Sequence, residues 1–259
     1  MNVLDRFRLD GRRLFITGGS RGFGRVIALA AAEAGADIAL NARDAETLTR
    51  TADEIKQRGR KVWTFVGDIA DPKTCETLCG RVLAEAGPID ILVNNVGGRN
   101  LDVAIENTDI VTWQTFMDLN LTHVFLCTKI IGGAMLDRGW GRVINIASIS
   151  GLVANRGIAG RHYETAKAAV IHFTRATAAD WAPRGVTANA ICPGLFMTEA
   201  NQNWAKKNPE AIDTFVKAVP MGRTGNPEEI GPLAIYLASP ASSYVTGAAF
   251  VIDGGYTLW

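Results

Sequence analysis

The sequence carries almost no net charge and few charged residues for its length. Across 259 residues, 27 Lys and Arg face 26 Asp and Glu, which leaves a formal net charge of +1, and only 20% of the residues are charged. A chain without an excess of one sign projects no strong field toward a polyanion. We therefore expect no nucleic-acid partner.

Long uncharged apolar runs are also missing. No such run reaches the roughly 20 residues that cross a bilayer. Residues 1–13 hold four arginines and no apolar stretch of the kind found in a secretory signal. These absences predict no membrane association and a cytoplasmic location.

Cysteine and histidine are scarce, at four and three residues. Four scattered cysteines in a chain of this size make no disulfide framework, which agrees with a reducing compartment. Cys75 and Cys79 could share one helix face, but a metal site needs further ligands, and the histidines are distant in sequence. We predict no metal site.

What the sequence does contain is a regular alternation of short apolar runs with longer stretches of helical period. Continuous apolar runs are typical of strands that are buried on both faces of a parallel sheet. The runs are 14–17, 37–42, 62–66, 89–94, 142–147, 186–191 and 248–252, and the helix candidates are 23–34, 45–58, 72–86, 112–136, 163–182 and 227–238. This order predicts an α/β fold with a doubly wound parallel sheet, in a single domain over residues 1–259.

The least regular segment is 194–224, where Pro209, Pro220 and polar residues interrupt the alternation. In open α/β sheets, ligands bind beyond the carboxyl ends of the strands. Because this segment follows the sixth predicted strand, we predict that it forms a lid over the substrate.

A glycine-rich turn, TGGSRGFG at residues 17–24, follows the first predicted strand and leads directly into a helix. Glycine adopts positive φ and lets the backbone approach a pyrophosphate that sits on the helix N-terminus. Such a turn alone is a weak signal and could be no more than a tight connection. Its place after the first strand of a βαβ series favours dinucleotide binding.

The end of the second predicted strand favours NADP(H) over NAD(H). An acidic residue there bonds the ribose 2′-OH, whereas arginine accommodates a 2′-phosphate. Ala42 occupies the expected acid position and Arg43 follows it, while Arg21 in the glycine-rich turn offers a second cation. Two alternatives stay open: Asp44 could bond a ribose hydroxyl, and Arg43 could be a solvated surface charge.

Tyr163 and Lys167 are four residues apart, so they share one face of a predicted helix. A phenol with a pKa of about 10 is a poor acid or base at neutral pH, but a neighbouring ammonium group favours the phenolate and lowers that pKa. Tyr163 could then exchange a proton with an alcohol oxygen. The Tyr-x-x-x-Lys pattern is common, so it does not establish an active site by itself.

Six motifs occur in order along the chain: the glycine-rich turn, Asn94-Asn95-Val96-Gly97, Asn120, Ser148, Tyr163-x-x-x-Lys167 and Pro193-Gly194. Together they resemble the short-chain dehydrogenase/reductase family over about residues 9–256. The resemblance implies a Rossmann-type sheet of seven strands and reversible hydride transfer between a nicotinamide cofactor and an alcohol or ketone. Segments 40–43, 120–126 and 180–182 are most similar to gluconate 5-dehydrogenase-type members.

The resemblance implies a role for each of four residues at the reacting atoms. Tyr163 would donate or accept the proton, and Lys167 would bond the nicotinamide ribose and acidify Tyr163. Ser148 would hydrogen-bond the substrate oxygen, and Asn120 would hold a water that links Lys167 to solvent. Two hydroxyl donors aimed at one oxygen stabilise the alkoxide character that develops there.

The resemblance also implies a set of cofactor contacts and a homotetramer, the usual assembly of the family. The expected cofactor-binding residues are Gly18, Ser20, Arg21, Gly22, Phe23, Gly24, Arg43, Asp68, Ile69, Asn95, Gly97, Tyr163, Lys167, Pro193, Gly194 and Thr198.

One departure from the family pattern concerns the active serine. The interval from Ser148 to Tyr163 is 15 residues, longer than the usual spacing, which Ser150 would restore. We choose Ser148 because Gly151 follows it as in the family's Ser-x-x-Gly stretch. This choice places the insertion in the loop 155–162, which we expect to line the substrate mouth.

Cations near that mouth suggest an anionic substrate. Arg156, Arg161 and His162 lie in or beside the loop, and Arg99 follows the Asn-Asn motif. Arginine matches carboxylate oxygens in a bidentate fork, although these residues could instead be solvated charges. The predicted substrate-binding residues are Ser148, Arg156, Arg161 and His162.

We therefore predict an oxidoreductase that acts on a sugar acid such as gluconate or keto-gluconate. A 3-oxoacyl-carrier-protein reductase would share the same catalytic residues. A non-catalytic dinucleotide-sensing protein is the alternative from another class, and the intact set of four catalytic residues argues against it.

Overall fold

Seven parallel strands form one sheet in the order β3-β2-β1-β4-β5-β6-β7. The structure is a computed structural model that describes residues 2–99, 103–155 and 160–258. The strands are β1 (Arg13–Ile16), β2 (Asp37–Ala42), β3 (Val62–Val66), β4 (Ile91–Asn94), β5 (Gly141–Ile146), β6 (Val186–Pro193) and β7 (Ala249–Ile252). The predicted α/β fold with a doubly wound parallel sheet is confirmed.

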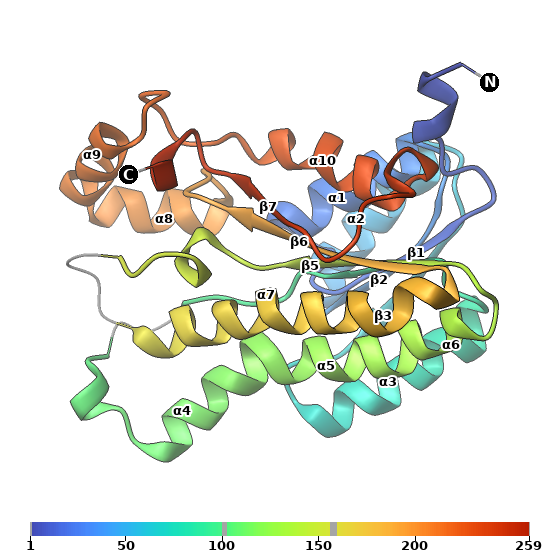
Figure 1. Cartoon of the computed structure of the whole chain (residues 1–259), viewed down its shortest axis with the longest axis horizontal. Coiled ribbons are helices and arrows are strands. Elements are labelled where there is room, and N and C mark those ends of the chain that lie inside the picture. The colour runs from blue at the N-terminus through green and yellow to red at the C-terminus, as the bar shows by residue number, and fades with distance from the viewer. Residues whose placement is uncertain (1, 100–102, 156–159, 259) are drawn as a thin grey trace.

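Helices cover both faces of the sheet, as Figure 1 shows. One layer holds α1 (Gly22–Glu33), α2 (Ala45–Gln57) and α10 (Ile230–Ala238); the other holds α3 (Pro72–Ala86), α4 (Ile110–Met117), α5 (His123–Cys127), α6 (Gly133–Leu136) and α7 (Arg161–Trp181). Each layer buries its own apolar core against the sheet: we call the core under α1, α2 and α10 the upper core and the core under α3 and α5 the lower core. Burial on both faces explains why the five central strands are largely apolar, whereas the edge strands β3 and β7 are only partly buried.

The strand order reverses direction between β1 and β4. At such a switch point the connections leave the carboxyl edge on opposite faces and open a crevice between them, which is where open α/β sheets bind ligands. The glycine-rich turn follows β1, and the Asn-Asn motif follows β4, so both predicted motifs lie at this edge.

The apolar helical stretch Ile110–Leu136 is interrupted by two π-helical segments, Asp118–Thr122 and Thr128–Gly132. Among the described helices it alone has the length and composition to cross a membrane. Half of its most apolar window is buried inside the protein, where α5 contacts α3 and α4 contacts α7. The stretch therefore serves as a core helix of this fold.

Two helices occupy the segment that the sequence left irregular. They are α8 (Glu199–Lys207) and α9 (Pro209–Ala218), and both lie at the carboxyl edge of the sheet (Figure 1). Pro209 does not interrupt a helix here, because it stands in the first turn of α9, where its missing N–H has no intrahelical partner to lose.

Candidate active site

The glycine-rich turn provides an anion cradle at the start of α1. Gly18 and Gly22 have φ of 67° and 53°, a region that L side chains rarely adopt. A Cβ on Gly24 would lie 2.0 Å from the Gly18 carbonyl oxygen, so only glycine lets the helix approach the turn this closely. The N-cap, Arg21, makes no side-chain cap bond, and the first turn of α1 has no acidic residue. The helix therefore presents uncapped N–H donors and no competing carboxylate.

The two loops at the switch point are tied together through Thr17, for which the sequence suggested no role. Its Oγ1 accepts hydrogen bonds from the backbone N–H groups of Asn95 (3.0 Å) and Val96 (3.2 Å). Asn95 Nδ2 donates in return to the Thr17 carbonyl oxygen (2.9 Å). The side chain of Asn95 thus holds the glycine-rich turn in place. A threonine at the end of β1, beside the turn, was the available signal.

Arg43 and Asp68, both predicted to bind the cofactor, lie together beyond β2 and β3. Arg43 Nη1 is 3.5 Å from Asp68 Oδ2, and both side chains are well exposed. Asp44 N-caps α2, because its Oδ1 accepts from the backbone N–H of Thr47 (2.8 Å), a bond that together with the Thr47 hydroxyl lowers the pKa of Asp44. The capping bond gives Asp44 a structural role of its own. The Ile69 side chain is buried in the lower core, so its predicted cofactor contact would be made by the backbone.

At the far side of the cleft, the end of β6 packs against the closing turn of the chain. A Cβ on Gly194 would lie 2.9 Å from Asp253 Cβ, so glycine is needed there for close packing. Thr198 N-caps α8, and a Cβ on Gly22 would lie 3.8 Å from its methyl group. Phe196, which sequence reasoning missed, packs edge-to-face on Phe23 at 5.1 Å between ring centroids. These contacts bring residues 194–198 over the glycine-rich turn.

Asn120 lies in the first π-helical segment of the Ile110–Leu136 stretch, a feature frequent at functional sites. Its Oδ1 accepts from the Gly98 N–H (2.9 Å), and its Nδ2 donates to the carbonyl oxygens of Gly98 and Phe116 (both 3.1 Å). A Cβ on Gly97 would lie 2.9 Å from Asn120 Oδ1 and 2.8 Å from Lys167 Nζ. The absence of a side chain at Gly97 therefore leaves room for Lys167 Nζ and Asn120 Oδ1 beside its backbone.

Lys167 is 3% exposed and donates from Nζ to the Ile146 carbonyl oxygen at 2.8 Å. Burial lowers the pKa of this ammonium group to about 8. Gly151 packs directly on the backbone of Lys167, since a Cβ there would lie 2.6 Å from the Lys167 carbonyl carbon. This contact supports the choice of register in which Gly151 matches the Ser-x-x-Gly stretch.

Ser148 and Tyr163 lie side by side at the carboxyl edge of β5. Ser148 Oγ accepts from the Ser150 N–H (3.1 Å), and its hydroxyl lies near enough to Tyr163 to favour the phenolate. Burial raises the pKa of Tyr163 above its ordinary value, while the Ser148 hydroxyl and the charge of Arg99 counteract part of that rise. Contrary to the sequence-based prediction, the pKa of Tyr163 therefore lies above and not below its ordinary value. Lys167 Nζ is 5.8 Å from the Tyr163 ring centroid and is bonded elsewhere.

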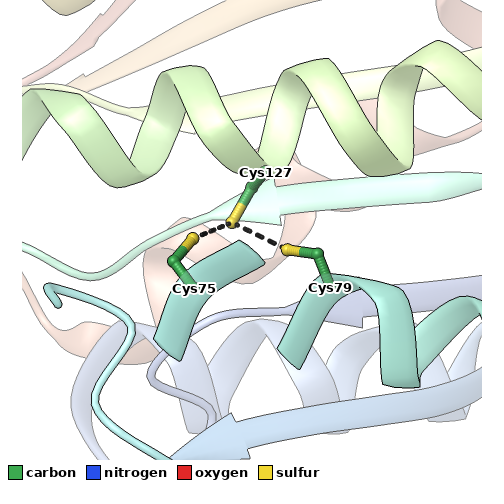
Figure 2. A group of neighbouring side chains, drawn as sticks. All are labelled: Cys75, Cys79 and Cys127. Atoms are coloured by element: carbon green, nitrogen blue, oxygen red, sulfur yellow. Dashed lines mark hydrogen bonds between the residues drawn. The ribbon is translucent and has the colours of Figure 1, made fainter. Parts of the chain in front are cut away.

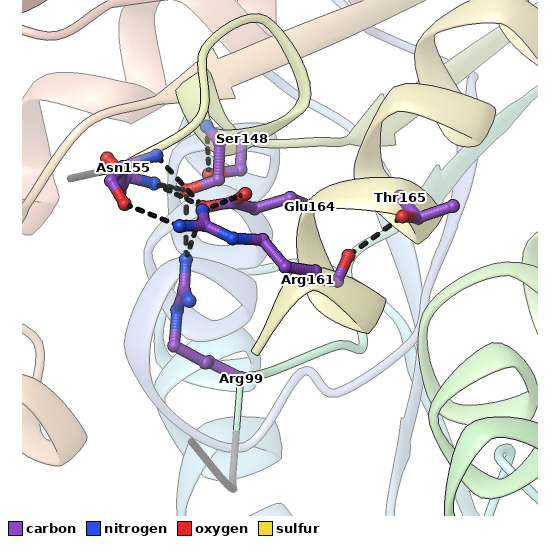
Figure 3. Close-up of polar contacts among 7 residues, drawn as sticks. Arg99, Ser148, Asn155, Arg161, Glu164 and Thr165 are labelled. Carbon is purple, nitrogen blue, oxygen red and sulfur yellow. Dashed lines mark hydrogen bonds and ion pairs between the residues drawn. The ribbon is translucent and has the colours of Figure 1, made fainter. Parts of the chain in front are cut away.

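The rim beside Tyr163 is a charged network centred on Glu164, drawn in Figure 3. Arg161 Nη1 lies 2.6 Å from Glu164 Oε2, and Arg99 Nη2 lies 3.6 Å from Glu164 Oε1. Asn155 donates to Glu164 from its backbone (3.0 Å) and its Nδ2 (3.1 Å), and Nδ2 also donates to Ser150 Oγ (2.9 Å). Burial favours the neutral acid, but the bonds from Arg161 and Asn155 outweigh it and lower the pKa of Glu164.

The predicted mouth cations thus differ in their surroundings. The Arg99 guanidinium lies 5.0 Å from the Tyr163 ring centroid, at the reacting end of the cleft. Arg161 is bonded to Glu164 and the Asn155 carbonyl oxygen. His162 does not line an open mouth, because it is 2% exposed and packs against Phe116 with 3.7 Å between ring centroids and an interplanar angle of 36°. Arg156 lies outside the described residues.

A family model described as "Enoyl-(Acyl carrier protein) reductase" matches residues 18–257. A short-chain type dehydrogenase/reductase from Mycobacterium marinum has a solved structure that superposes with a TM-score of 0.89 at 40% identity, over 99% of each chain. The chain belongs to the short-chain dehydrogenase/reductase family. Members of this family act on CH–OH groups, so the chain is an oxidoreductase of that kind. The alternative of a non-catalytic dinucleotide-sensing protein is therefore set aside.

Two further relatives within the short-chain dehydrogenase/reductase family bear on the substrate. Galactitol 2-dehydrogenase (L-tagatose-forming) from Cereibacter sphaeroides is 41% identical over 254 residues, 98% of each chain. A gluconate 5-dehydrogenase from Burkholderia cenocepacia, solved in complex with NADP and tartrate, is 36% identical, with a TM-score of 0.92 over 100% of each chain. The chain is therefore similar both to an enzyme named for a neutral polyol and to one named for a sugar acid.

Proposed function

We propose that the protein is an NADP(H)-dependent oxidoreductase that interconverts a secondary alcohol and a ketone on a sugar acid such as gluconate or keto-gluconate. The observation that carries the choice of an acid is the rim network. Arg99 and Arg161 both approach the Glu164 carboxylate, and the Arg99 guanidinium lies 5.0 Å from the Tyr163 ring centroid. A carboxylate on the substrate would accept hydrogen bonds from a guanidinium at this position.

The residues of the cleft fit NADP(H). The uncapped start of α1 suits the pyrophosphate, and glycines at 18 and 22 leave the backbone open to it. Arg21 and Arg43 are the cations available to a 2′-phosphate, and the choice of NADP(H) over NAD(H) rests on them. When bound, the nicotinamide supplies or accepts the hydride. The other cofactor contacts predicted from the sequence are part of this proposal.

The catalytic residues would manage the proton and the charge on the substrate oxygen. Tyr163 is neutral at pH 7, since a phenol has a pKa of about 10 and burial raises it further, so its hydroxyl would give a proton to a ketone oxygen. Ser148 adds a second donor aimed at the same oxygen. Lys167 is a positioning residue for the cofactor ribose, and its ammonium group brings positive charge to the site. Asn120 fixes the backbone of Gly98 through two hydrogen bonds.

The segment 194–224 is proposed as the substrate lid. Its residues 196 and 198 already contact the glycine-rich turn through Phe23 and Gly22. The predicted homotetramer and the predicted cytoplasmic location remain predictions.

The proposal is tested by nicotinamide absorbance with NADP and NAD over three substrate classes: sugar acids, neutral polyols such as galactitol, and 3-oxoacyl thioesters. We expect the highest kcat/KM for a sugar acid with NADP. Activity on galactitol alone would support the interconversion of an alcohol and a ketone but contradict the proposal that the substrate carries a carboxylate. Activity on thioesters alone would favour the carrier-protein reductase alternative.

Arg99→Gln provides the matched variant for this panel. If Arg99 binds a carboxylate, the substitution raises KM for sugar acids by about tenfold, the scale of one lost charged contact of 1.4 kcal/mol. The KM of a neutral polyol stays within a few-fold. An equal rise for both substrates would show that Arg99 acts on the fold of the rim and not on a substrate charge.

A further inference from the structure

Three cysteine side chains from two helices meet in the lower core. Cys75 and Cys79 lie one turn apart on α3, and Cys127 ends α5, which packs against α3 (Figure 2). Cys127 Sγ lies 3.7 Å from Cys75 Sγ and 3.6 Å from Cys79 Sγ, and all three sulfurs lie within 4.8 Å of one another. All three residues are completely buried, and none has a part in the reaction proposed above. The sequence pattern indicated that Cys75 and Cys79 share a helix face but did not indicate that Cys127 lies beside them.

Two of the three separations between the sulfurs are those of ligands around one central atom, and the third is below 4.8 Å. For bonds of about 2.3 Å between ion and sulfur and angles of roughly 100–110°, the sulfurs lie about 3.5–3.8 Å apart. The separations of 3.6 and 3.7 Å fall in this range. A disulfide would instead bring two sulfurs to about 2.05 Å, so pairing any two of these thiols would need a larger movement.

The surroundings limit the charge that the site can hold. Apolar side chains, including Phe65, Leu78 and Val82, belong to the same core cluster as the sulfurs. Among the residues that the structure describes, no fourth ligand atom joins the group. Zinc prefers four ligands, and with three thiolates it would leave one negative charge; Cu(I) would leave two. An unpaired charge in such a core is costly, and the acidic Asp71, the N-cap of α3, adds to that cost.

We propose that Cys75, Cys79 and Cys127 form a binding site for one trivalent thiophilic metalloid ion, arsenic(III) or antimony(III). Three thiolates and one trivalent ion make a neutral complex, which the apolar core accepts. With arsenous acid, each As–O bond breaks as an As–S bond forms, and each thiol proton leaves with the hydroxyl group as water. Three waters are released, arsenic stays trivalent, and no oxidant or reductant takes part.

Binding would link α3 to α5 and would stabilise the folded protein. A ligand that binds only the folded state raises the unfolding temperature in proportion to the logarithm of its concentration over Kd. Because the sulfurs are buried, the ion enters through local opening of the helix pair, so association is slow compared with that of a surface thiol. This inference is independent of the substrate and cofactor proposed above.

The first test is the intact mass of the folded, unmodified protein after incubation with sodium arsenite and a phosphine reductant. We expect one adduct per chain, with the mass of one arsenic less three hydrogens, and a rise in unfolding temperature. X-ray absorption at the arsenic edge is expected to give three sulfur neighbours and no oxygen. No adduct, or an adduct that has lost only two hydrogens and keeps a hydroxyl group, would overturn the proposal.

Variants identify the ligands. Cys75→Ala, Cys79→Ala and Cys127→Ala are each expected to abolish the three-hydrogen adduct, whereas Cys192→Ala, which changes the fourth buried cysteine in β6, retains it. Circular dichroism checks that each variant is folded. A three-hydrogen adduct that persists in Cys127→Ala, or that disappears in Cys192→Ala, contradicts the assignment. The mass and absorption results on the unmodified chain stand whether or not a variant folds.

A competition experiment tests the charge argument. Equimolar zinc is expected to leave the arsenic adduct intact and to give no rise in unfolding temperature by itself. If zinc displaces arsenic, the sulfur donors and not the neutral charge of the complex decide which ion binds. That result would overturn the assignment to a trivalent ion.

Discussion

Two parts of the active site differ in what holds their side chains: the floor, which comprises Tyr163 and the buried Asn120, Ser148 and Lys167, and the rim, which comprises the Glu164 network and the Arg43–Asp68 pair. On the floor, Lys167 and Asn120 are buried and are fixed by backbone carbonyl and N–H groups. On the rim, Arg43 and Arg161 are more exposed and are fixed by carboxylates, Asp68 and Glu164. Backbone partners are set by the sheet and helices, whereas exposed ion pairs contribute little and can exchange partners. The floor is therefore preorganised for one reaction, and the rim can adapt to different ligands.

The largest effect is expected from the floor. Tyr163→Phe removes the hydroxyl that exchanges the proton, so turnover falls about 10³-fold, within the usual range for loss of a general acid. Cofactor affinity, measured by fluorescence titration, stays within a few-fold because the ring remains. Turnover close to that of the unmodified protein would remove Tyr163 from the mechanism.

Next comes a pair of serines that differ in position by two residues. Ser148→Ala removes the second donor to the substrate oxygen, and kcat falls about 10²-fold, as for the loss of one oxyanion donor. Ser150→Ala is the matched control, because its hydroxyl bonds to Asn155 on the rim and changes kcat only a few-fold. If kcat falls about 10²-fold in Ser150→Ala and not in Ser148→Ala, Ser150 is the active serine, and the insertion does not lie in the loop 155–162.

The pH profile of ketone reduction reports on the floor through Lys167. Its pKa of about 8 means that the ammonium form is present below pH 8 and is lost above it. Tyr163 stays protonated over this range because its pKa is raised. We expect kcat/KM for reduction to be level below pH 8 and to fall by up to about tenfold per pH unit above it. A level profile up to pH 10 would contradict a role for the Lys167 charge.

The smallest effect is expected from the rim. Arg43→Ala removes one exposed cation, so Kd for NADPH rises about fivefold to tenfold while Kd for NADH stays nearly unchanged. Isothermal titration with both cofactors gives the ratio. The matched Arg50→Ala, an exposed arginine on α2 paired within its own helix to Glu46, is expected to change neither value. Equal weakening of both cofactors would make Arg43 a bystander.

Local patterns were sufficient to predict the sheet and much of the floor. Strands buried on both faces are continuous apolar runs, and the glycine-rich turn has a shape that other residues cannot adopt. The rest depends on contacts between distant residues. No local pattern indicated that Glu164 would also take up Arg99, that the His162 ring would pack against Phe116, or that Cys127 would meet Cys75 across two helices.

Asn120 lies in the π-helical segment Asp118–Thr122, so its position depends on the number of residues in that segment. A π-turn accommodates one residue more than an α-turn, and one residue corresponds to about 100° of rotation around the axis. Deleting a single residue there would let the segment close into an ordinary α-helix and turn Asn120 away from Gly98. The length of this segment therefore contributes to the placement of Asn120 alongside the hydrogen bonds of its side chain.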